Sequence, residues 1–336
     1  MKKILIRGAN WLGDSVISIP VIRTVRKNYP DAYIGLVLRK GPAELLAALP
    51  YVNKIYLEGK DDRAVIKEKF DLGILLTNSF SSALKFWLWG VKERIGYPAE
   101  YRGIFLTKKV PLAGKPRSIH LSEEYFRILE AAGLKEFEKK PEFFIPEKNL
   151  LKAGEMLKET GFQNSELLIG VCPGATYGPA KIWPKERYLN VISYLIKEKG
   201  AKIIIFGGSG ETEIINYLLK NQDFSDSIMA SPDNDILTGA ALIKKCRLFI
   251  TNDTGPMHIA AALGIPVIAI FGSTNPVWTG PSGAGTRVIY RKLECSPCYS
   301  RSCKNKKANY ECLTGISEKE VLSSIEELKI FKREEK

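Results

Sequence analysis

Histidine is nearly absent from this sequence, with only His120 and His258 among 336 residues. That scarcity argues against a metalloenzyme whose metal is held by several imidazoles. Charge is also absent from one long window, because no Asp, Glu, Lys or Arg lies between residues 254 and 286. The same window carries four prolines. Since proline breaks helices, we expect strands and turns of a soluble core there, and no membrane span.

An export signal is missing as well. The apolar run after Met1-Lys2-Lys3 is interrupted by Arg7, so it is too short for the core of a signal peptide. We therefore expect a cytoplasmic protein. Hydrophobic residues make up 45% of the chain and charged residues 26%, which is typical of globular proteins and excludes wholesale disorder. The length favours two domains.

The chain is basic, with 50 Lys and Arg against 37 Asp and Glu. Much of the excess lies in the first half, and the stretch from Lys85 to Arg117 has eight basic residues against two acidic ones. Such an excess is either an ordinary solvated surface or a face for a polyanion, namely nucleic acid, a phosphorylated substrate or an anionic membrane. Charge alone leaves these alternatives open.

Strand and helix patterns alternate along both halves of the chain. Apolar, β-branched runs predict strands at 3–7, 32–38, 54–57, 72–76, 167–171, 202–206, 248–250 and 267–271. Helical spacing fits residues 16–26, 41–49, 62–69, 151–166, 185–199, 211–220, 236–245, 257–263 and 317–330, and Pro20 is expected to kink the first of these. The alternation predicts an α/β fold with parallel, doubly wound sheets.

A polar region at 134–150 separates two such series. We therefore expect a domain boundary between 145 and 167, and divide the chain into residues 1–155 and 156–336. The last helix could pack on either half. Two doubly wound domains usually bind ligands in a cleft between them.

The loop Gly8-Ala9-Asn10-Trp11-Leu12-Gly13-Asp14 follows the first strand. It satisfies neither the dinucleotide fingerprint nor the P-loop. Asp14 stands where a helix begins, so it is either an ordinary acid of a first helical turn or a general base beside the cleft.

A second loop, Thr251-Asn252-Asp253-Thr254-Gly255-Pro256-Met257-His258, joins a strand to a helix. Asp253 or Thr254 could cap that helix, whose free N–H groups could hold a diphosphate. His258 would lie close to this anion site.

Two further loops follow strands of the second half. Residues 173–184 carry two glycines, three prolines and Lys181, which could reach a phosphate, although an ordinary surface turn is the alternative. Residues 206–211 form a Gly-rich turn that ends at Glu211. Three such loops at one sheet edge strengthen the case for a ligand site.

Four cysteines lie within eighteen residues, with the spacing C-x2-C-x4-C-x8-C: Cys295, Cys298, Cys303 and Cys312. The pattern suggests a structural metal or iron–sulfur site, but a second C-x2-C pair is missing. Reduced thiols or a redox-sensitive pair are favoured over the metal. Disulfides are rare in cytosolic proteins.

Taken together, residues 8–14, 173–184 and 253–258 and the segment Phe271-Gly272-Ser273-Thr274 resemble the ADP-heptose:lipopolysaccharide heptosyltransferases of glycosyltransferase family 9. The Cys-Ser-Pro-Cys segment and Asn78-Ser79-Phe80-Ser81-Ser82-Ala83 are most similar to its heptosyltransferase II branch. The resemblance implies a GT-B fold with two Rossmann-like domains that face a central cleft. The acceptor would bind mainly to the N-terminal domain and ADP-heptose to the C-terminal one.

The implied reaction transfers L-glycero-D-manno-heptose, with inversion, onto the first heptose of the lipopolysaccharide inner core. By resemblance, Asp14 is the base that takes the proton of the acceptor hydroxyl, and Lys181 binds a phosphate of the donor. The resemblance implies no required cofactor, and a bound Mg²⁺ is compatible with it. The resemblance places further residues at the donor: Thr176, Tyr177, Glu211, Asp253, Thr254, Gly255 and His258.

The implied acceptor is a heptosyl-Kdo2-lipid A, an anionic glycolipid of the inner membrane. We therefore expect the basic stretch to face the acceptor or the anionic membrane surface, which would place the protein at the cytoplasmic face of that membrane. The acceptor candidates are Asn78, Ser79, Arg94, Arg102 and Arg117.

Three alternatives remain. A heptosyltransferase I-like enzyme or a related ADP-sugar transferase would share these motifs. A nucleic-acid-binding protein would share the charge, but no helix-turn-helix, zinc finger or stacking motif is evident, so we expect no nucleic acid. A nucleotide-dependent oxidoreductase with a metal at the cysteines is the third.

Overall fold

The computed structural model describes residues 1–111, 114–162, 167–220, 228–231, 235–305, 307 and 309–331. The chain divides into two compact units, Met1–Phe144 and Ile145–Lys336. The division falls at the start of the range 145–167 expected from the sequence, but before the predicted division at 155/156, so residues 145–155 belong to the second unit. The reason is that α7 (Glu147–Glu159) packs on α10 (Ile236–Lys245) of the second unit, where Asn149 donates to Thr238 at 2.9 Å.

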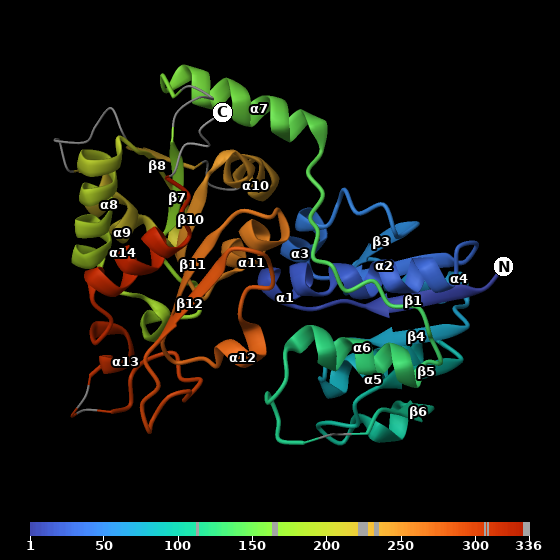
Figure 1. Cartoon of the computed structure of the whole chain (residues 1–336). Coiled ribbons are helices and arrows are strands. Elements are labelled where there is room, and N and C mark those ends of the chain that lie inside the picture. Colours follow the sequence, from blue (N-terminus) through green and yellow to red (C-terminus); the bar gives the residue numbers. More distant parts are fainter. Residues whose placement is uncertain are drawn as a thin grey trace. The chain divides into compact units, whose positions relative to one another are not determined.

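The first unit is built on a parallel sheet with strand order β3-β2-β1-β4-β5-β6 (Figure 1). Its strands are β1 (Lys3–Arg7), β2 (Tyr33–Leu38), β3 (Lys54–Leu57), β4 (Leu72–Leu75), β5 (Glu93–Gly96) and β6 (Lys108–Lys109). Its helices are α1 (Leu12–Ile17), α2 (Ile19–Asn28), α3 (Lys40–Leu45), α4 (Asp62–Glu68), α5 (Phe80–Leu88), η1 (Arg102–Phe105) and α6 (Leu121–Ala131).

The second unit repeats this plan with strand order β12-β11-β10-β7-β8-β9. Its strands are β7 (Leu168–Cys172), β8 (Lys202–Ile205), β9 (Ile228–Ala230), β10 (Leu248–Asn252), β11 (Val267–Phe271) and β12 (Thr286–Tyr290). Its other helices are η2 (Pro179–Lys181), α8 (Lys185–Lys199), η3 (Ser209–Glu211), α9 (Thr212–Leu219), α11 (Gly255–Ala262), α12 (Pro276–Thr279), α13 (Glu311–Thr314) and α14 (Glu318–Glu327).

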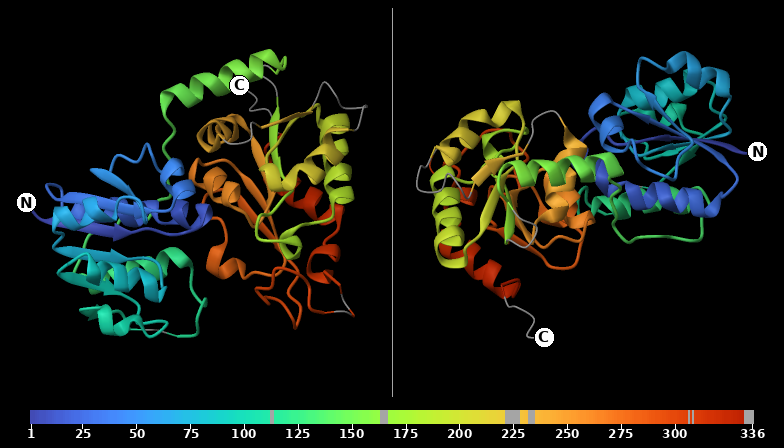
Figure 2. Two further views of the ribbon diagram at one scale, coloured as in Figure 1. Left: turned by 180° about the vertical axis from the view of Figure 1, so that it is seen from behind. Right: turned by 90° about the horizontal axis from the view of Figure 1, so that it is seen from above.

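Every strand pair in the described residues is parallel, with registers such as Ile4 opposite Ile34 and Phe249 opposite Val267. Helices cover both faces of each sheet, as the two views in Figure 2 show. This confirms the expected α/β class with two doubly wound sheets. Parallel strands buried on both faces need continuous apolar runs, which explains why β1, β7, β10 and β11 were readable from the sequence.

Two local differences have clear causes. The helix expected at 16–26 is split at Ser18, because Pro20 occupies the first turn of a new helix, α2. The helix expected at 151–166 begins earlier, at Glu147, and ends at Glu159; its last four expected positions lie outside the described residues.

The last helix belongs to the second unit. α14 packs on α8, β11 and β12, and Val321 and Ile325 complete a core that also holds Trp183. The indole nitrogen of Trp183 donates to Ile316 O at 3.1 Å. None of the helices in the described part of the chain is both long and apolar enough to cross a membrane.

Candidate active site

The loop from Gly8 to Asp14 connects β1 to α1 at the carboxyl edge of the first sheet. A larger residue in place of Gly8 would displace the Leu38 side chain, because a Cβ would lie 2.4 Å from one of its methyl carbons. Asp14 is the third residue of α1 and stands in its first turn, half-buried. The helix N-terminus favours a negative charge at this position. A carboxylate therefore stands at the sheet edge where doubly wound folds bind ligands.

Arg7 and Glu58 hold this loop in place, and neither residue was predicted from the sequence. Arg7 Nη1 donates to Gly8 O at 2.6 Å, and Nη2 donates to Asn10 Oδ1 at 2.7 Å. The same Nη2 pairs with Glu58 Oε2 at 2.8 Å, in a buried setting. A charged residue directly after the buried apolar run of residues 4–6 was the available signal for Arg7.

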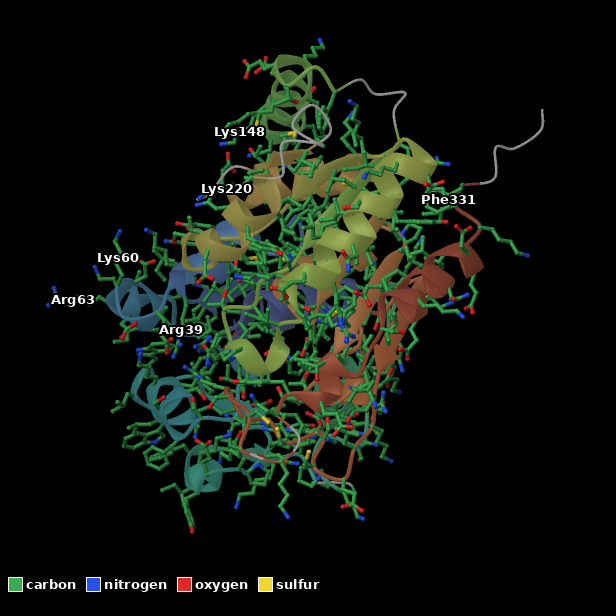
Figure 3. All side chains as sticks on the ribbon, turned by 90° about the vertical axis from the view of Figure 1, so that its left-hand side faces the viewer. Arg39, Lys60, Arg63, Lys148, Lys220 and Phe331 are labelled. Atoms are coloured by element: carbon green, nitrogen blue, oxygen red, sulfur yellow. The ribbon has the colours of Figure 1, made fainter. Side chains whose placement is uncertain are left out.

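Two further cationic side chains lie close to the carboxylate of Glu58. Lys85 Nζ of α5 lies 3.2 Å from Oε1, and Nε of Arg39 (labelled in Figure 3) lies 3.7 Å from Oε2. Burial alone would raise the pKa of Glu58, but Arg7 and then Lys85 outweigh it, so the pKa lies below its ordinary value. Burial lowers the pKa of Arg7, and Glu58 opposes that shift. Glu58 is thus held as a carboxylate.

Helix α6 supports the same region. Tyr125 is buried, and burial first and the Asp14 carboxylate second raise its pKa well above the ordinary value. Asp14 therefore faces a neutral phenol. His120 caps α6, with Nδ1 accepting from Ser122 N at 3.3 Å, which is a structural role.

The acceptor candidates fall into two groups. Asn78 and Ser79 lie on the loop before α5, where Ser79 is the N-cap. Arg102 is fully buried, and its guanidinium donates to Tyr97 O at 2.7 Å and to Asn78 Oδ1 at 3.2 Å. Burial lowers its pKa to about 10. The expectation that Arg102 faces an acceptor or a membrane is therefore wrong, because its donors hold the Asn78 loop from within.

The two other arginines differ from each other. Arg94 is half-buried, and its guanidinium donates to Phe105 O and Val91 O, each at 2.5 Å. Its donors thus hold the backbone around η1. Arg117 is exposed and has a left-handed backbone with φ of 60°.

In the second unit, Lys181 and Asp253 form the central pair. Lys181 Nζ lies 2.5 Å from Asp253 Oδ2, with side-chain exposures of 14% and 5%. Thr274 Oγ1 donates to the same carboxylate oxygen at 2.6 Å. Asp253 thus holds the lysine and does not cap α11: Thr254 is the N-cap and forms no side-chain cap bond. The side chain of the N-cap residue therefore does not occupy the first-turn N–H groups of α11, which is the end of a helix that favours an anion.

Asn252, which the sequence analysis did not single out, ties the loops of this site together. Its Oδ1 accepts from Trp183 N at 3.2 Å and its Nδ2 donates to Pro173 O at 2.7 Å. Glu211 lies against the same loop, since a Cβ on Gly174 would meet the Glu211 side chain at 2.5 Å, and its Oε2 accepts from Gly208 N at 2.6 Å. The three loops predicted to share one sheet edge are therefore adjacent.

The remaining donor candidates lie on the loops beside the Lys181–Asp253 pair and on α11. Gly255 and His258 lie on α11, and His258 is buried. Thr254 Oγ1 is 3.2 Å from Thr251 Oγ1. Thr176 is exposed on the loop of residues 173–184, which we call the donor loop. Tyr177 lies beside Lys181, whose Nζ is 4.9 Å from the ring centroid.

The four clustered cysteines lie between β12 and α14, mainly on the segment 291–310, which we call the cysteine loop. Burial first, and then Cys298, Cys295 and Cys303, raise the pKa of Cys312 to about 11, so the four thiols share one neighbourhood. Cys303 Sγ accepts from Tyr310 N at 3.3 Å. Among the residues that the structure describes, no group of three or more His, Cys, Asp or Glu is arranged to hold a metal.

Comparison with known proteins connects this geometry to a family. Residues 60–309 match the model of glycosyltransferase family 9 (heptosyltransferase). Lipopolysaccharide heptosyltransferase 2 of Escherichia coli K12 is 29% identical over 308 residues, which cover 85% of this chain and 87% of that protein. Lipooligosaccharide heptosyltransferase 2 of Haemophilus ducreyi is 30% identical over 353 residues, covering 97% and 99%.

Solved structures agree. The ADP-heptose lipopolysaccharide heptosyltransferase II of E. coli has a TM-score of 0.81 and 27% identity, with 98% of each chain covered. A glycosyltransferase of family 9 from Veillonella parvula has the same fold, with a TM-score of 0.86 and 24% identity over 98% of each chain. The fold class is therefore GT-B, with one α/β unit on each side of residue 144. The chain belongs to glycosyltransferase family 9, the heptosyltransferases, and is a glycosyltransferase.

Proposed function

We propose that this enzyme is a heptosyltransferase II, which transfers L-glycero-D-manno-heptose from ADP-heptose to the first heptose of the lipopolysaccharide inner core. The observation that carries the proposal is the pairing of Lys181 with Asp253 beside the uncapped start of α11. Relatives called heptosyltransferase 2 that span most of the chain support it.

In this mechanism the second unit binds the donor. Lys181 and the first-turn N–H groups of α11 stabilise the charge that builds on the ADP leaving group. Thr176 and Tyr177 would line the diphosphate, and Glu211 the ribose. Asp253 fixes Lys181, and His258 supports the start of the same helix. These groups supply the electrostatic stabilisation, so we propose that no cofactor is required and that excess chelator leaves transfer unchanged.

In the first unit, Asp14 would act as the general base. It takes the proton from the acceptor hydroxyl as the oxygen attacks the anomeric carbon and the bond to the diphosphate breaks. Attack opposite the leaving group inverts the anomeric centre. Asn78 and Ser79, held by the buried Arg102, would contact the acceptor sugar.

The decisive experiment is a transfer assay with ADP-heptose and Kdo2-lipid A acceptors that carry zero, one or two heptoses. We expect product with the acceptor of one heptose. Product only with the heptose-free acceptor would instead identify a heptosyltransferase I-like enzyme. Transfer from a different ADP-sugar would identify a related ADP-sugar transferase.

We further propose that the first unit attaches to the anionic inner membrane through an apolar patch on α5 and η1. Exposed apolar side chains concentrate there: Leu88 is 60% exposed, Ile104 78% and Tyr101 92%. The rings of Trp87 and Phe105 lie 5.7 Å apart and join the two elements. Aromatic and aliphatic side chains of this kind enter the interfacial layer of a bilayer.

The charge beside the patch suits an anionic surface. Within the basic stretch, Lys85 and Lys92 pair with Glu58 and Asp71. Lys108 and Lys109 of the edge strand β6 are exposed and form no ion pair with any described residue. Each such lysine near an anionic bilayer contributes about 1 kcal/mol.

Vesicle flotation tests this attachment. We expect binding to vesicles that contain phosphatidylglycerol, and loss of binding in the Leu88→Ser/Ile104→Ser and Lys108→Glu/Lys109→Glu variants. Leu151→Ser, at an exposed apolar position on α7, is the matched control. Unchanged flotation of both double variants would refute the patch, and dimerisation through it would show as a doubled mass in solution.

A further inference from the structure

Tyr177 of the donor loop has two cations beside its ring. Lys181 Nζ lies 4.9 Å from the ring centroid, and Cζ of Arg301 lies 5.7 Å from it. Lys181 comes from the donor loop itself, whereas Arg301 comes from the cysteine loop. The cysteine loop is the orange-to-red segment between β12 and α13 in Figure 1. Two remote segments therefore bring positive charge to one place.

The backbone of Arg301 is fixed against the donor loop. Ala180 N donates to Arg301 O at 3.1 Å, and Tyr177 Oη donates to Tyr299 O at 2.5 Å. Gly178 has φ of +140°, and a Cβ there would lie 2.6 Å from Arg301 O. Only glycine allows this approach, so the sequence of the donor loop is adapted to the cysteine loop.

The opposite side of the cysteine loop is also anchored near the site. Tyr299 N donates to Ser273 O at 2.8 Å, and Ser296 Oγ donates to Gly272 O at 2.6 Å. The next residue, Thr274, holds Asp253. The same short segment thus connects the cysteine loop to the Lys181–Asp253 pair.

The charge balance of this site leaves a role for Arg301. Asp253 lies 2.5 Å from Lys181, so it balances part of the positive charge that Lys181 brings to a diphosphate. Arg301 is exposed and forms no ion pair with any acid in the described part of the chain. A guanidinium remains charged at all working pH values and donates two parallel hydrogen bonds to phosphate oxygens.

We infer that Arg301 is a second cation of the donor site and binds the diphosphate of the nucleotide sugar together with Lys181. The inference rests on the proposed function, because it takes a nucleoside diphosphate sugar as the ligand. Arg301 moves no proton and forms no bond. It holds the diphosphate in the bound donor and remains with ADP when the sugar leaves.

Calorimetric titration with ADP, AMP and adenosine tests the inference. Arg301→Met should weaken ADP binding by about 10- to 100-fold, as expected for hydrogen bonds to a charged group. Adenosine binding should stay unchanged, which also shows that the variant is folded. Arg301→Lys should recover part of the lost ADP affinity. Higher salt should reduce the difference in ADP affinity between wild type and Arg301→Met.

The matched control is Lys304→Met, which removes an exposed cation from the same loop and should bind ADP like the wild type. Equal ADP affinity of Arg301→Met and wild type would overturn the inference. An equal loss of adenosine affinity would also overturn it, since the arginine would then support the loop and not the phosphates. A wild-type protein that binds neither ADP nor ADP-heptose would instead overturn the proposed function.

Discussion

The ammonium group of Lys181 lies 2.5 Å from Oδ2 of Asp253, and Thr274 donates to that same oxygen at 2.6 Å. The carboxylate therefore fixes where the lysine points before any ligand arrives. Such preorganisation is the property that makes a charge effective in stabilising a leaving group.

Replacing Lys181 by methionine should reduce kcat/KM for transfer by about 10²- to 10³-fold, the usual cost of losing one preorganised electrostatic contact. Steady-state assays with ADP-heptose measure the change. Lys185→Met removes a lysine that pairs at the surface with Glu213 and should leave kcat/KM unchanged. A Lys181→Met enzyme with near-normal turnover would exclude Lys181 from leaving-group stabilisation.

Asp14→Asn should abolish transfer while ADP-heptose still binds, because the substitution removes the base and keeps the size of the side chain. Tyr125, whose pKa the Asp14 carboxylate helps to raise, should titrate at lower pH in this variant. Donor affinity and turnover are measured separately, by calorimetry and by product formation. Retained turnover would mean that another group takes the proton.

Arg7→Met should destabilise the first unit by about 1–3 kcal/mol, because the half-buried Glu58 loses its main partner and the carbonyl of Gly8 loses a charged donor. Chemical denaturation gives the free energy of unfolding. Arg39 meets the same carboxylate at 3.7 Å but is largely exposed, so Arg39→Met should cost less than about 1 kcal/mol. Similar losses of unfolding free energy in the two variants would show that burial of the arginine does not determine the strength of its ion pair with Glu58.

The lowered pKa of Asp235 should make the stability of the second unit depend on pH. Burial would raise its pKa, but Lys152 and Thr238 outweigh burial and lower the pKa to about 2. A lowered folded-state pKa stabilises the fold above the unfolded pKa, and this stabilisation is lost as pH falls toward the folded value. The difference in unfolding free energy between wild type and Asp235→Asn should therefore shrink between about pH 4 and pH 2. A difference in unfolding free energy that stays constant over this pH range would contradict the prediction.

The sequence was most informative where one short segment determines its own structure. Buried strands such as β10 and β11 are continuous apolar runs, and Pro20 marks the boundary between α1 and α2. Strand β5 contains only four residues, two of them charged, and β12 is an edge strand with exposed positions. Strand β5 has no apolar run, and the apolar run of β12 is only three residues long, so neither strand was predicted.

The site shows the same limit. Asp253 and Lys181 were both identified from their loops, but their ion pair joins residues 72 positions apart. No local pattern shows that Asp253 holds the lysine and leaves α11 uncapped. Arg102 was expected on a surface because it lies in a basic stretch, yet carbonyl groups from two separate segments bury it. Such partners are defined only by the folded chain.

The packing of α14 has a consequence for synthesis of the protein on the ribosome. The first unit has all its strands and helices by residue 131, so it can fold while the rest of the chain is being translated. In the second unit, Trp183 and the sheet depend on Ile316, Val321 and Ile325 to close the core. The half that carries Lys181 therefore reaches its final structure only after nearly the whole chain has emerged.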